Sequence, residues 1–385
     1  MKRYLATSAA LALASGAAMA GGLDRTGQPV GIIFEKGNYA ELSFSHTNPD
    51  VTGTDVRTLN PAGTPSGNVA LSFNQISGGI KYDLNDRVSF SMIFDQPWGS
   101  DVRYPSADAN PITPGSFLLG GTTAIADSEA ITGIVRYKFN ENFSVHGGIR
   151  YQQIKGDITL KGLAYNSPLT PGNDLDGYNV RVARDGAVGW LVGGAYERPD
   201  IALRLAVTYQ SEIEHTFATT ESLPDVPGTT FNGSTTTKTP QSLNVDFQTG
   251  IAKDTLLLAG IRWAEHSVVK LRPSTANVDL IDLSDSVSYT LGVARRFNEN
   301  LVGSISLGYE AEDSDNLVSP LAPTNGYKSI SVGLQYTKDQ FKISGGVRYT
   351  DLGDAFAETG TPDVARASFS GNKAVSVGVK FGYYF

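Results

Sequence analysis

The chain of 385 residues has no cysteine and only four histidines. Without cysteine there is no disulfide framework and no thiolate ligand for a metal. The histidines lack the spacing of a metal motif, and no G-x-S-x-G elbow or Walker loop occurs. We therefore expect no metal, no other cofactor and no enzyme; the histidines are His46, His146, His215 and His266.

Two further features are missing. The formal net charge is -8 and the pI is about 5.1, so the chain lacks the basic surface that nucleic-acid binding requires. No segment after the N-terminus offers the eighteen consecutive apolar residues of a transmembrane helix. We expect neither nucleic acid as a partner nor a helical membrane span.

The N-terminus has the pattern of a secretory signal peptide. Lys2 and Arg3 precede a mostly apolar stretch, residues 5–14, and Ala18-Met19-Ala20 has the small-x-small pattern of a cleavage site. The sequence predicts a signal peptide over residues 1–20 and a mature chain that begins at Gly21. The protein is thus expected in the periplasm or beyond.

The rest of the chain shows a hydrophobic period of two, which is typical of strands with two different faces. One predicted strand places Phe341, Ile343, Val347 and Tyr349 on one face and Lys342, Ser344, Gly346, Arg348 and Thr350 on the other. A soluble sandwich and a membrane barrel both produce this alternation. Strands of ten or more residues and aromatic residues beside short turns favour the barrel; these aromatics are Tyr82, Tyr137, Phe139, Tyr196, Phe297, Tyr336 and Phe341.

Connections alternate between short and long, the pattern of outer-membrane barrels with long loops outside the cell. The short turns are 85–87, 140–142, 198–200, 253–254, 298–300 and 338–339; the long connections are 49–68, 96–123, 158–185, 216–240, 273–284, 311–326 and 352–371. These thirteen connections separate fourteen strands. The sequence predicts an all-β, transmembrane, antiparallel β-barrel of about 14 strands over residues 38–385.

The last strand alternates from Val375 and stops on Phe385. A terminal strand that ends on an aromatic residue is similar to the outer-membrane assembly signal. We expect Phe385 to engage the barrel-assembly machinery, and the first and last strands to pair, because only a closed sheet leaves no edge in lipid.

By strand parity, a set of basic side chains should point into the lumen. One interpretation pairs them with acids such as Asp95 and Glu41 across the pore. The other lets some of them hold the carboxylate of an amphiphilic ligand. The residues are Arg136, Arg150, Arg204, Arg262, Arg348 and Lys380.

The third strand is interrupted by Asp95-Gln96-Pro97-Trp98-Gly99. Proline cannot donate to a ladder and glycine permits a bend, so this stretch is either the end of the strand or a gap in the wall.

Apolar clusters occur in three long connections. They indicate either a cap in which the loops pack on one another or a hydrophobic docking surface. The clusters are Phe117-Leu118-Leu119; Leu160, Leu163, Tyr165 and Leu169; and Phe217, Leu223, Val226 and Phe231. We expect substrate capture by Phe117, Leu118, Leu163 and Phe231.

With these residues in view, the sequence resembles the FadL family of outer-membrane channels for long-chain fatty acids and other hydrophobic compounds. The resemblance rests on the opening stretch Phe34–Gly53, on the break at Asp95–Gly99, and on Tyr104-Pro105 and Gly120-Gly121. It implies a lumen plugged by the N-terminus, capture in the outer loops and lateral exit at the kink. The family's plug is longer; only Gly21–Gly37 is available here, and Asn60-Pro61-Ala62 falls in the first outer loop.

Together these features predict a bacterial outer-membrane protein with a short plug over residues 21–37. Its predicted function is passive transport of hydrophobic or amphiphilic small molecules, such as fatty acids or hydrocarbons, with exit into membrane lipid. The alternatives are a general diffusion porin for polar solutes, or a barrel enzyme or adhesin that acts through its loops. The sequence leaves the substrate and the oligomeric state open.

Overall fold

The computed structural model describes residues 23–57, 63–107, 114–166, 174–313, 316–360 and 363–385. The predicted signal peptide, Gly21 and Gly22 of the predicted plug, Asn60-Pro61-Ala62 and Leu169 lie outside the described residues.

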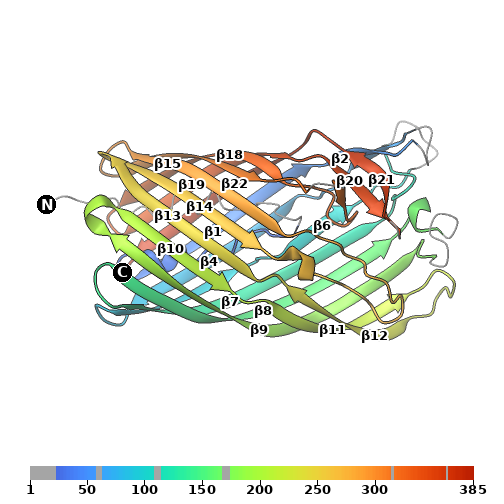
Figure 1. The fold of residues 1–385 in the computed structure, drawn as a ribbon, viewed down its shortest axis with the longest axis horizontal. Helices are drawn as coiled ribbons and strands as arrows, with labels where there is room; N and C mark the ends of the chain where they lie inside the picture. The colour runs from blue at the N-terminus through green and yellow to red at the C-terminus, as the bar shows by residue number, and fades with distance from the viewer. Residues whose placement is uncertain (1–22, 58–62, 108–113, 167–173, 314–315, 361–362) are drawn as a thin grey trace.

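A closed antiparallel barrel of 14 strands dominates the molecule (Figure 1). Three wall strands are each formed by two consecutive segments, separated by an irregularity of two or three residues. Along the wall the strands are β1 (Tyr39–Asp50), β4 (Phe73–Asp83), β5 (Val88–Asp95) with β6 (Gly99–Arg103), β7 (Thr123–Lys138), β8 (Phe143–Leu160), β9 (Tyr178–Arg198), β10 (Leu203–Gln210) with β11 (Ile213–Ser222), β12 (Phe231–Thr239) with β13 (Ser242–Ala252), β14 (Thr255–Ala264), β15 (Ser286–Arg296), β16 (Leu301–Glu310), β18 (Tyr327–Lys338), β19 (Phe341–Leu352) and β22 (Asn372–Tyr384).

The first and last wall strands pair with each other, as the sequence predicts. The register of β1 with β22 runs without a shift from Tyr39–Tyr384 to Asp50–Lys373. This pairing satisfies the backbone groups of both strands, which would otherwise be exposed to hydrocarbon. The predicted fold class is therefore confirmed.

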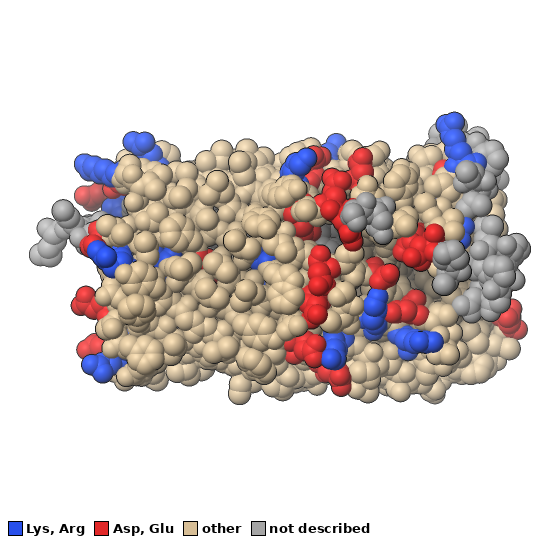
Figure 2. All heavy atoms as spheres, viewed as in Figure 1, with Lys and Arg blue, Asp and Glu red and all other residues tan. Residues whose placement is uncertain are grey.

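The outer face of the wall is apolar. Alternate residues along the strands project outward and are about half exposed; examples are Leu42 and Phe44 on β1, and Ile305, Leu307 and Tyr309 on β16. Figure 2 shows a broad zone nearly free of charged side chains, with charge gathered at one end and in a band toward the other. The period-two pattern therefore separates a lipid-facing surface from a polar lumen.

The short turns lie together at the end of the barrel that also holds the C-terminus (Figure 1). Asp254 and Asp339 adopt φ values of +57° and +54° in two of these turns, a conformation that aspartate tolerates better than most residues. A third turn contains the single-turn helix η3 (Pro199–Ile201).

The far end is more structured than the sequence predicts. Much of the connection expected at 216–240 is a hairpin, because β11 and β12 pair from Ile213–Thr239 to Glu221–Phe231. The connections expected at 49–68, 311–326 and 352–371 contribute a second, five-stranded sheet. Its strands are β2 (Thr52–Asp55), β3 (Pro65–Asn68), β17 (Leu317–Val318), β20 (Ala355–Thr359) and β21 (Val364–Phe369).

This small sheet and the neighbouring loops enclose a hydrophobic core at the outer end of the barrel. Leu118, Leu119 and Phe369 are fully buried in it, and Tyr104 meets the Phe369 ring edge-on. We call this assembly the cap. The remaining helices, η1 (Gly31–Phe34), η2 (Leu163–Tyr165) and η4 (His266–Val268), are single turns. Among the described residues, no helix is long and apolar enough to cross a membrane.

Candidate functional site

The N-terminal segment, residues 23–37, runs inside the barrel. In the half near the short turns, η1 packs Ile32 and Ile33 against Ile134 of β7 and Leu191 of β9. Two guanidinium groups lie over the ring of Phe34: that of Arg136 is 4.5 Å from the ring centroid, and that of Arg204 is 4.4 Å from it. Apolar contact and cation–π attraction thus hold this part of the segment to the wall.

A buried ion pair anchors the same part of the segment. The Glu35 carboxylate accepts a hydrogen bond from Lys342 Nζ at 2.7 Å and another from Tyr384 Oη at 2.7 Å. The side chains of Glu35 and Lys342 are only 3% and 1% exposed. A pair this deeply buried is favourable only while both partners are present.

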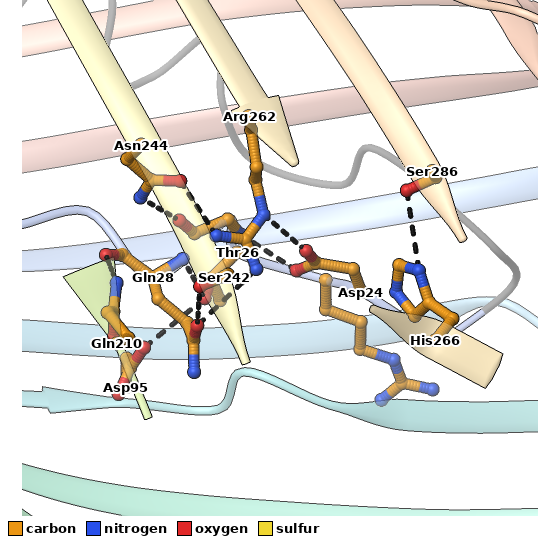
Figure 3. Close-up of polar contacts among 12 residues, drawn as sticks. Asp24, Thr26, Gln28, Asp95, Gln210, Ser242, Asn244, Arg262, His266 and Ser286 are labelled. Carbon is orange, nitrogen blue, oxygen red and sulfur yellow. Dashed lines mark hydrogen bonds and ion pairs between the residues drawn. The ribbon is translucent and has the colours of Figure 1, made fainter. Parts of the chain in front are cut away.

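The other part of the segment is held by polar contacts across the lumen (Figure 3). Arg262 of β14 donates to Asp24 at 2.7 Å and to Asn244 of β13 at 2.8 Å. Asn244 in turn donates to the Gly27 carbonyl at 2.9 Å, and Gln210 donates to the Gln28 carbonyl at 3.1 Å. The segment therefore contacts several wall strands that are distant in the sequence.

The third wall strand is broken where the sequence indicates a kink. Strand β5 ends at Asp95, paired with Ala130, and β6 begins at Gly99, paired with Asp127. The broken strand thus contains one residue more than its partner β7 across the same interval, which is the geometry of a bulge.

The kink leaves part of β4 without a ladder partner. Pairing of β4 with β5 stops at Gly78–Phe94, so residues 73–77 have no ladder partner on that side among the described strands. A side chain replaces the missing backbone bond, because Ile76 N donates to Gln96 Oε1 at 2.9 Å. A cavity of about 100 Å³ adjoins this gap, with Gln75, Ile76 and Asp95 in its lining.

The N-terminal segment supplies hydrogen bonds to the kink. Arg25 N donates to the Pro97 carbonyl at 2.9 Å, and Gly99 N donates to the Leu23 carbonyl at 3.0 Å. The Arg25 guanidinium lies so close to Gly99 that a Cβ atom there would be 2.3 Å from Arg25 Cζ. Glycine is therefore required at this position while Arg25 stays in place.

An apolar cavity of about 120 Å³ lies in the lumen between the kink and the cap. The N-terminal Leu23, the kink residue Trp98 and loop residues between wall strands reach into it. Its apolar lining includes Ala124, Ile154, Ile158, Val182, Phe217, Val269, Leu271, Ile281 and Leu321. A space lined in this way favours an uncharged, apolar occupant.

Beside this cavity, the His266 ring meets the Trp98 ring edge-on, with centroids 6.0 Å apart. His266 belongs to η4, between β14 and β15, and is fully buried. Burial lowers the pKa of His266 to about 4, so the ring is neutral at neutral pH. His266 therefore places no positive charge next to the cavity at neutral pH.

The predicted lumen cations are all at least partly buried, and most have partners within the wall or the N-terminal segment. Three form ion pairs with acids: Arg136 with Glu197, Arg262 with Asp24, and Lys380 with Glu41. Arg150 donates to Thr132 and Arg348 to Ser331, while Arg204 lies over Phe34.

The predicted capture residues occupy different environments. Phe117 is 53% exposed and Leu163 is 38% exposed, and they are neighbours because Leu163 N donates to the Phe117 carbonyl. Leu118, by contrast, is fully buried in the cap core. Phe231 is the first residue of β12 rather than a loop residue, and pairs with Glu221.

Sequence reasoning missed the polar contacts of residues 24–28 and the cavity lining contributed by the loops after β14 and β16. The alternating pattern of the strands gives no signal for either feature, because both depend on which segments outside the strands fold into the lumen. Among the described residues, no group of His, Cys, Asp and Glu could hold a metal ion.

Comparison with known proteins identifies the family to which this architecture belongs. A family model described as outer membrane protein transport protein (OMPP1/FadL/TodX) matches residues 2–385. The chain belongs to this family. The resemblance expected from the sequence is thereby confirmed, and the protein is an outer-membrane transport protein rather than an enzyme.

Solved structures show the same fold. A Pseudomonas aeruginosa FadL homologue aligns with a TM-score of 0.73 at 16% identity, over 97% of this chain and 98% of that one. The P. putida toluene transporter TodX gives 0.65 at 13% identity, over 91% of both chains. The Ralstonia pickettii toluene transporter TbuX gives 0.62 at 13% identity, over 98% of this chain and 94% of that one. A search of curated proteins found no match.

Proposed function

We propose that this protein carries uncharged hydrophobic small molecules, about the size of a single aromatic ring, passively across the outer membrane. The observation that carries the proposal is the apolar cavity between the kink and the cap. Its volume of about 120 Å³ is close to the roughly 150 Å³ of an engineered apolar protein cavity that stays dry and binds benzene.

The charged groups near the cavity are already paired, which also supports an uncharged substrate. Among the lining residues, Lys155 lies 3.5 Å from Asp127, and Lys238 lies 2.7 Å from Glu212. Arg262 lies 6.0 Å from the Trp98 ring, but its guanidinium is already paired with Asp24. A fatty-acid carboxylate would have to displace that carboxylate to gain a similar hydrogen bond. A polar solute would lose its hydrogen bonds to water without replacing them on the apolar lining, which disfavours the porin alternative.

The names of two similar structures point in the same direction, since TodX and TbuX are described as toluene transporters. Long-chain fatty acids are the other substrate class that the FadL resemblance implies. The cavity could hold only a short segment of such a chain at one time, so we rank hydrocarbons first.

The substrate proposal is tested by uptake in cells that lack their own hydrophobic-compound channels. Cells that produce the protein should accumulate radiolabelled toluene faster than cells with the empty vector, and glucose uptake should not change. Faster oleate uptake with unchanged toluene uptake would transfer the assignment to fatty acids. Faster glucose uptake alone would favour a porin.

We also propose that the substrate leaves the lumen sideways, through the gap between β4 and the kink. Exposing a methylene group to the aqueous periplasm costs about 0.8 kcal/mol, and a lateral exit into lipid avoids that cost. The gap is bridged by the Gln96 side chain, and side-chain contacts can open without unfolding the ladder.

Restoring the wall tests this exit. Replacing Pro97 with Val and Gly99 with Thr returns a donor and two strand-forming residues to the kink. Arg25 must be changed to Ala in the same variant, because its guanidinium occupies the space of the new side chain. The triple variant should assemble normally but lose toluene uptake, whereas Arg25→Ala alone should retain it. Full uptake through a restored wall would contradict lateral exit.

A further inference from the structure

The wall has a second interruption, between β9 and the strand formed by β10 and β11. Ladder pairs run from Leu203–Arg198 to Gln210–Leu191 and resume only at Thr219–Val182. Ser211 N donates to the Trp190 carbonyl at 2.9 Å. Beyond this bond, residues 183–189 and 212–218 form no ladder pairs with each other. On their other sides, β9 stays paired with β8 and β11 stays paired with β12.

The cause is a pair of bulges at opposite ends of the interrupted segment. On β10 the buried, inward residues are even-numbered (206–210), whereas on β11 they are odd-numbered (213–221). On β9 the register with β8 shifts between Ile154–Asp185 and Gly156–Val182. Because a one-residue slip reverses the direction of every side chain, the two facing segments are out of phase between the bulges.

Side chains bridge the unpaired segments 183–189 and 212–218, which we call the seam, in place of backbone hydrogen bonds. His215 Nδ1 lies 3.0 Å from Asp185 Oδ2 across the gap. Ile213 covers Gly189 so closely that a Cβ atom at position 189 would be 2.5 Å from Ile213 Cγ1. Such contacts can separate by rotation of side chains, at less cost than breaking a ladder.

The apolar cavity lies directly behind the seam. Phe217, one of the out-of-phase residues of β11, is 2% exposed and lines the cavity together with Val182 of β9. Its ring stacks on the ring of His215, with centroids 5.6 Å apart and planes inclined by 10°. Movement of His215 would therefore uncover an apolar wall of the cavity.

The outer side of the seam lies where the apolar band of the barrel meets the charged band. Val188 and Trp190 are 64% and 52% exposed and face outward. Just beyond them along β9, Arg184 pairs with Glu129 at 3.0 Å, and Figure 2 shows that charged side chains form a band toward the capped end of the barrel. This is the level at which hydrocarbon gives way to polar headgroups in the outer leaflet.

We infer that the seam between β9 and β11 is a side entrance, through which hydrophobic molecules dissolved at the outer leaflet pass into the apolar cavity. The inference rests on the proposed transport of uncharged hydrophobic molecules. Such molecules concentrate in the membrane because leaving water is favourable for apolar surface. A side entrance collects them there and bypasses the packed core of the cap.

A reversible disulfide tests the entrance, because the chain has no native cysteine. Gly189→Cys with Ile213→Cys places a sulfur near the position of Ile213 Cγ1, within reach of the new Cβ at 189. The matched control is Gly260→Cys with Thr290→Cys, on the paired strands β14 and β15. There the built Cβ at 260 lies 3.8 Å from Thr290 Cβ, a typical disulfide separation.

The measurement is the initial rate of radiolabelled toluene uptake by cells that carry each variant, oxidised and then reduced. Assembly is checked by heat-modifiable gel mobility. Oxidation should reduce uptake through the 189–213 variant to the empty-vector level, and reduction should restore it, while the control variant keeps its rate throughout. The single variant His215→Ala, which lacks the His215–Asp185 contact, should take up toluene faster than the wild type.

Full uptake by the oxidised 189–213 variant would overturn the side entrance and leave the proposed function intact. Equal loss in the oxidised control would also overturn it, because stiffening anywhere in the barrel would then suffice. Absence of toluene uptake by the wild type would refute the proposed function, and the inference with it.

Discussion

Removing Glu35 should release the N-terminal segment from the lumen. In Glu35→Ala, Lys342 loses the carboxylate that lies 2.7 Å away in the wild type, at a site where the lysine side chain is 1% exposed. Removing one partner of a buried ion pair costs about 3–5 kcal/mol. Since about 1.4 kcal/mol corresponds to a factor of ten, the population with an undocked segment should rise roughly a hundredfold to several thousandfold.

A thiol reporter at position 31 measures this population. A Cβ atom at Gly31 would have no neighbour within 4 Å, so Gly31→Cys should be tolerated. The rate at which a bulky, charged maleimide modifies this cysteine reports local opening when the segment redocks faster than it reacts. Glu35→Ala should accelerate the modification by the factor given above.

The matched control replaces both partners with methionine. Because no charge is then left buried, Glu35→Met with Lys342→Met should react at close to the wild-type rate. An unchanged rate in Glu35→Ala would refute the reasoning, since it would mean that the ion pair does not hold the segment. If the maleimide reaction is accelerated equally in the control, the shape of the glutamate side chain, and not its charge, holds the segment in place.

Three further predictions concern assembly, capture and the cap. Deletion of Phe385, whose backbone N–H donates to the Asn38 carbonyl at 3.1 Å, should lower the heat-modifiable fraction in the outer membrane; unchanged assembly would show that the terminal aromatic is dispensable. Replacing the exposed Phe117 and Leu163 with Ser should slow toluene uptake at low concentration without affecting assembly, and an unaltered rate would exclude them from capture. Leu118→Ala should destabilise the cap by about 2–5 kcal/mol, the usual cost of such a truncation in a core, measured as faster proteolysis of the outer loops; wild-type resistance would contradict the packing described.

Much of the fold follows from the sequence because a lipid-spanning sheet has few solutions. The period-two pattern, the short turns and the terminal strand that ends on Phe385 specify strands, their number and the closure of β22 on β1. Lipid and lumen impose opposite chemistry on the two faces, so each residue's parity also predicts its direction. Arg136 and Lys380 point inward as that parity requires.

The break at Asp95–Gly99 was also visible in the sequence, since proline and glycine interrupt an otherwise regular strand. The second seam was not. It arises from one extra residue near Ser211 and another near Arg184, and neither position carries a proline or glycine. A bulge in one strand becomes an interruption of the wall only when the neighbouring strand is known, which requires the tertiary pairing.

Sequence patterns alone predict the class of the molecule: a closed antiparallel barrel with an apolar exterior and an irregular third strand. The arrangement of the interior depends on tertiary contacts. The fold brings Asp24 to Arg262 and Glu35 to Lys342, across separations of 238 and 307 residues, and it buries Leu118 while exposing Phe117. Alternation is a local property imposed by lipid, whereas contacts across a lumen depend on loop folding and on which strands face each other around the ring.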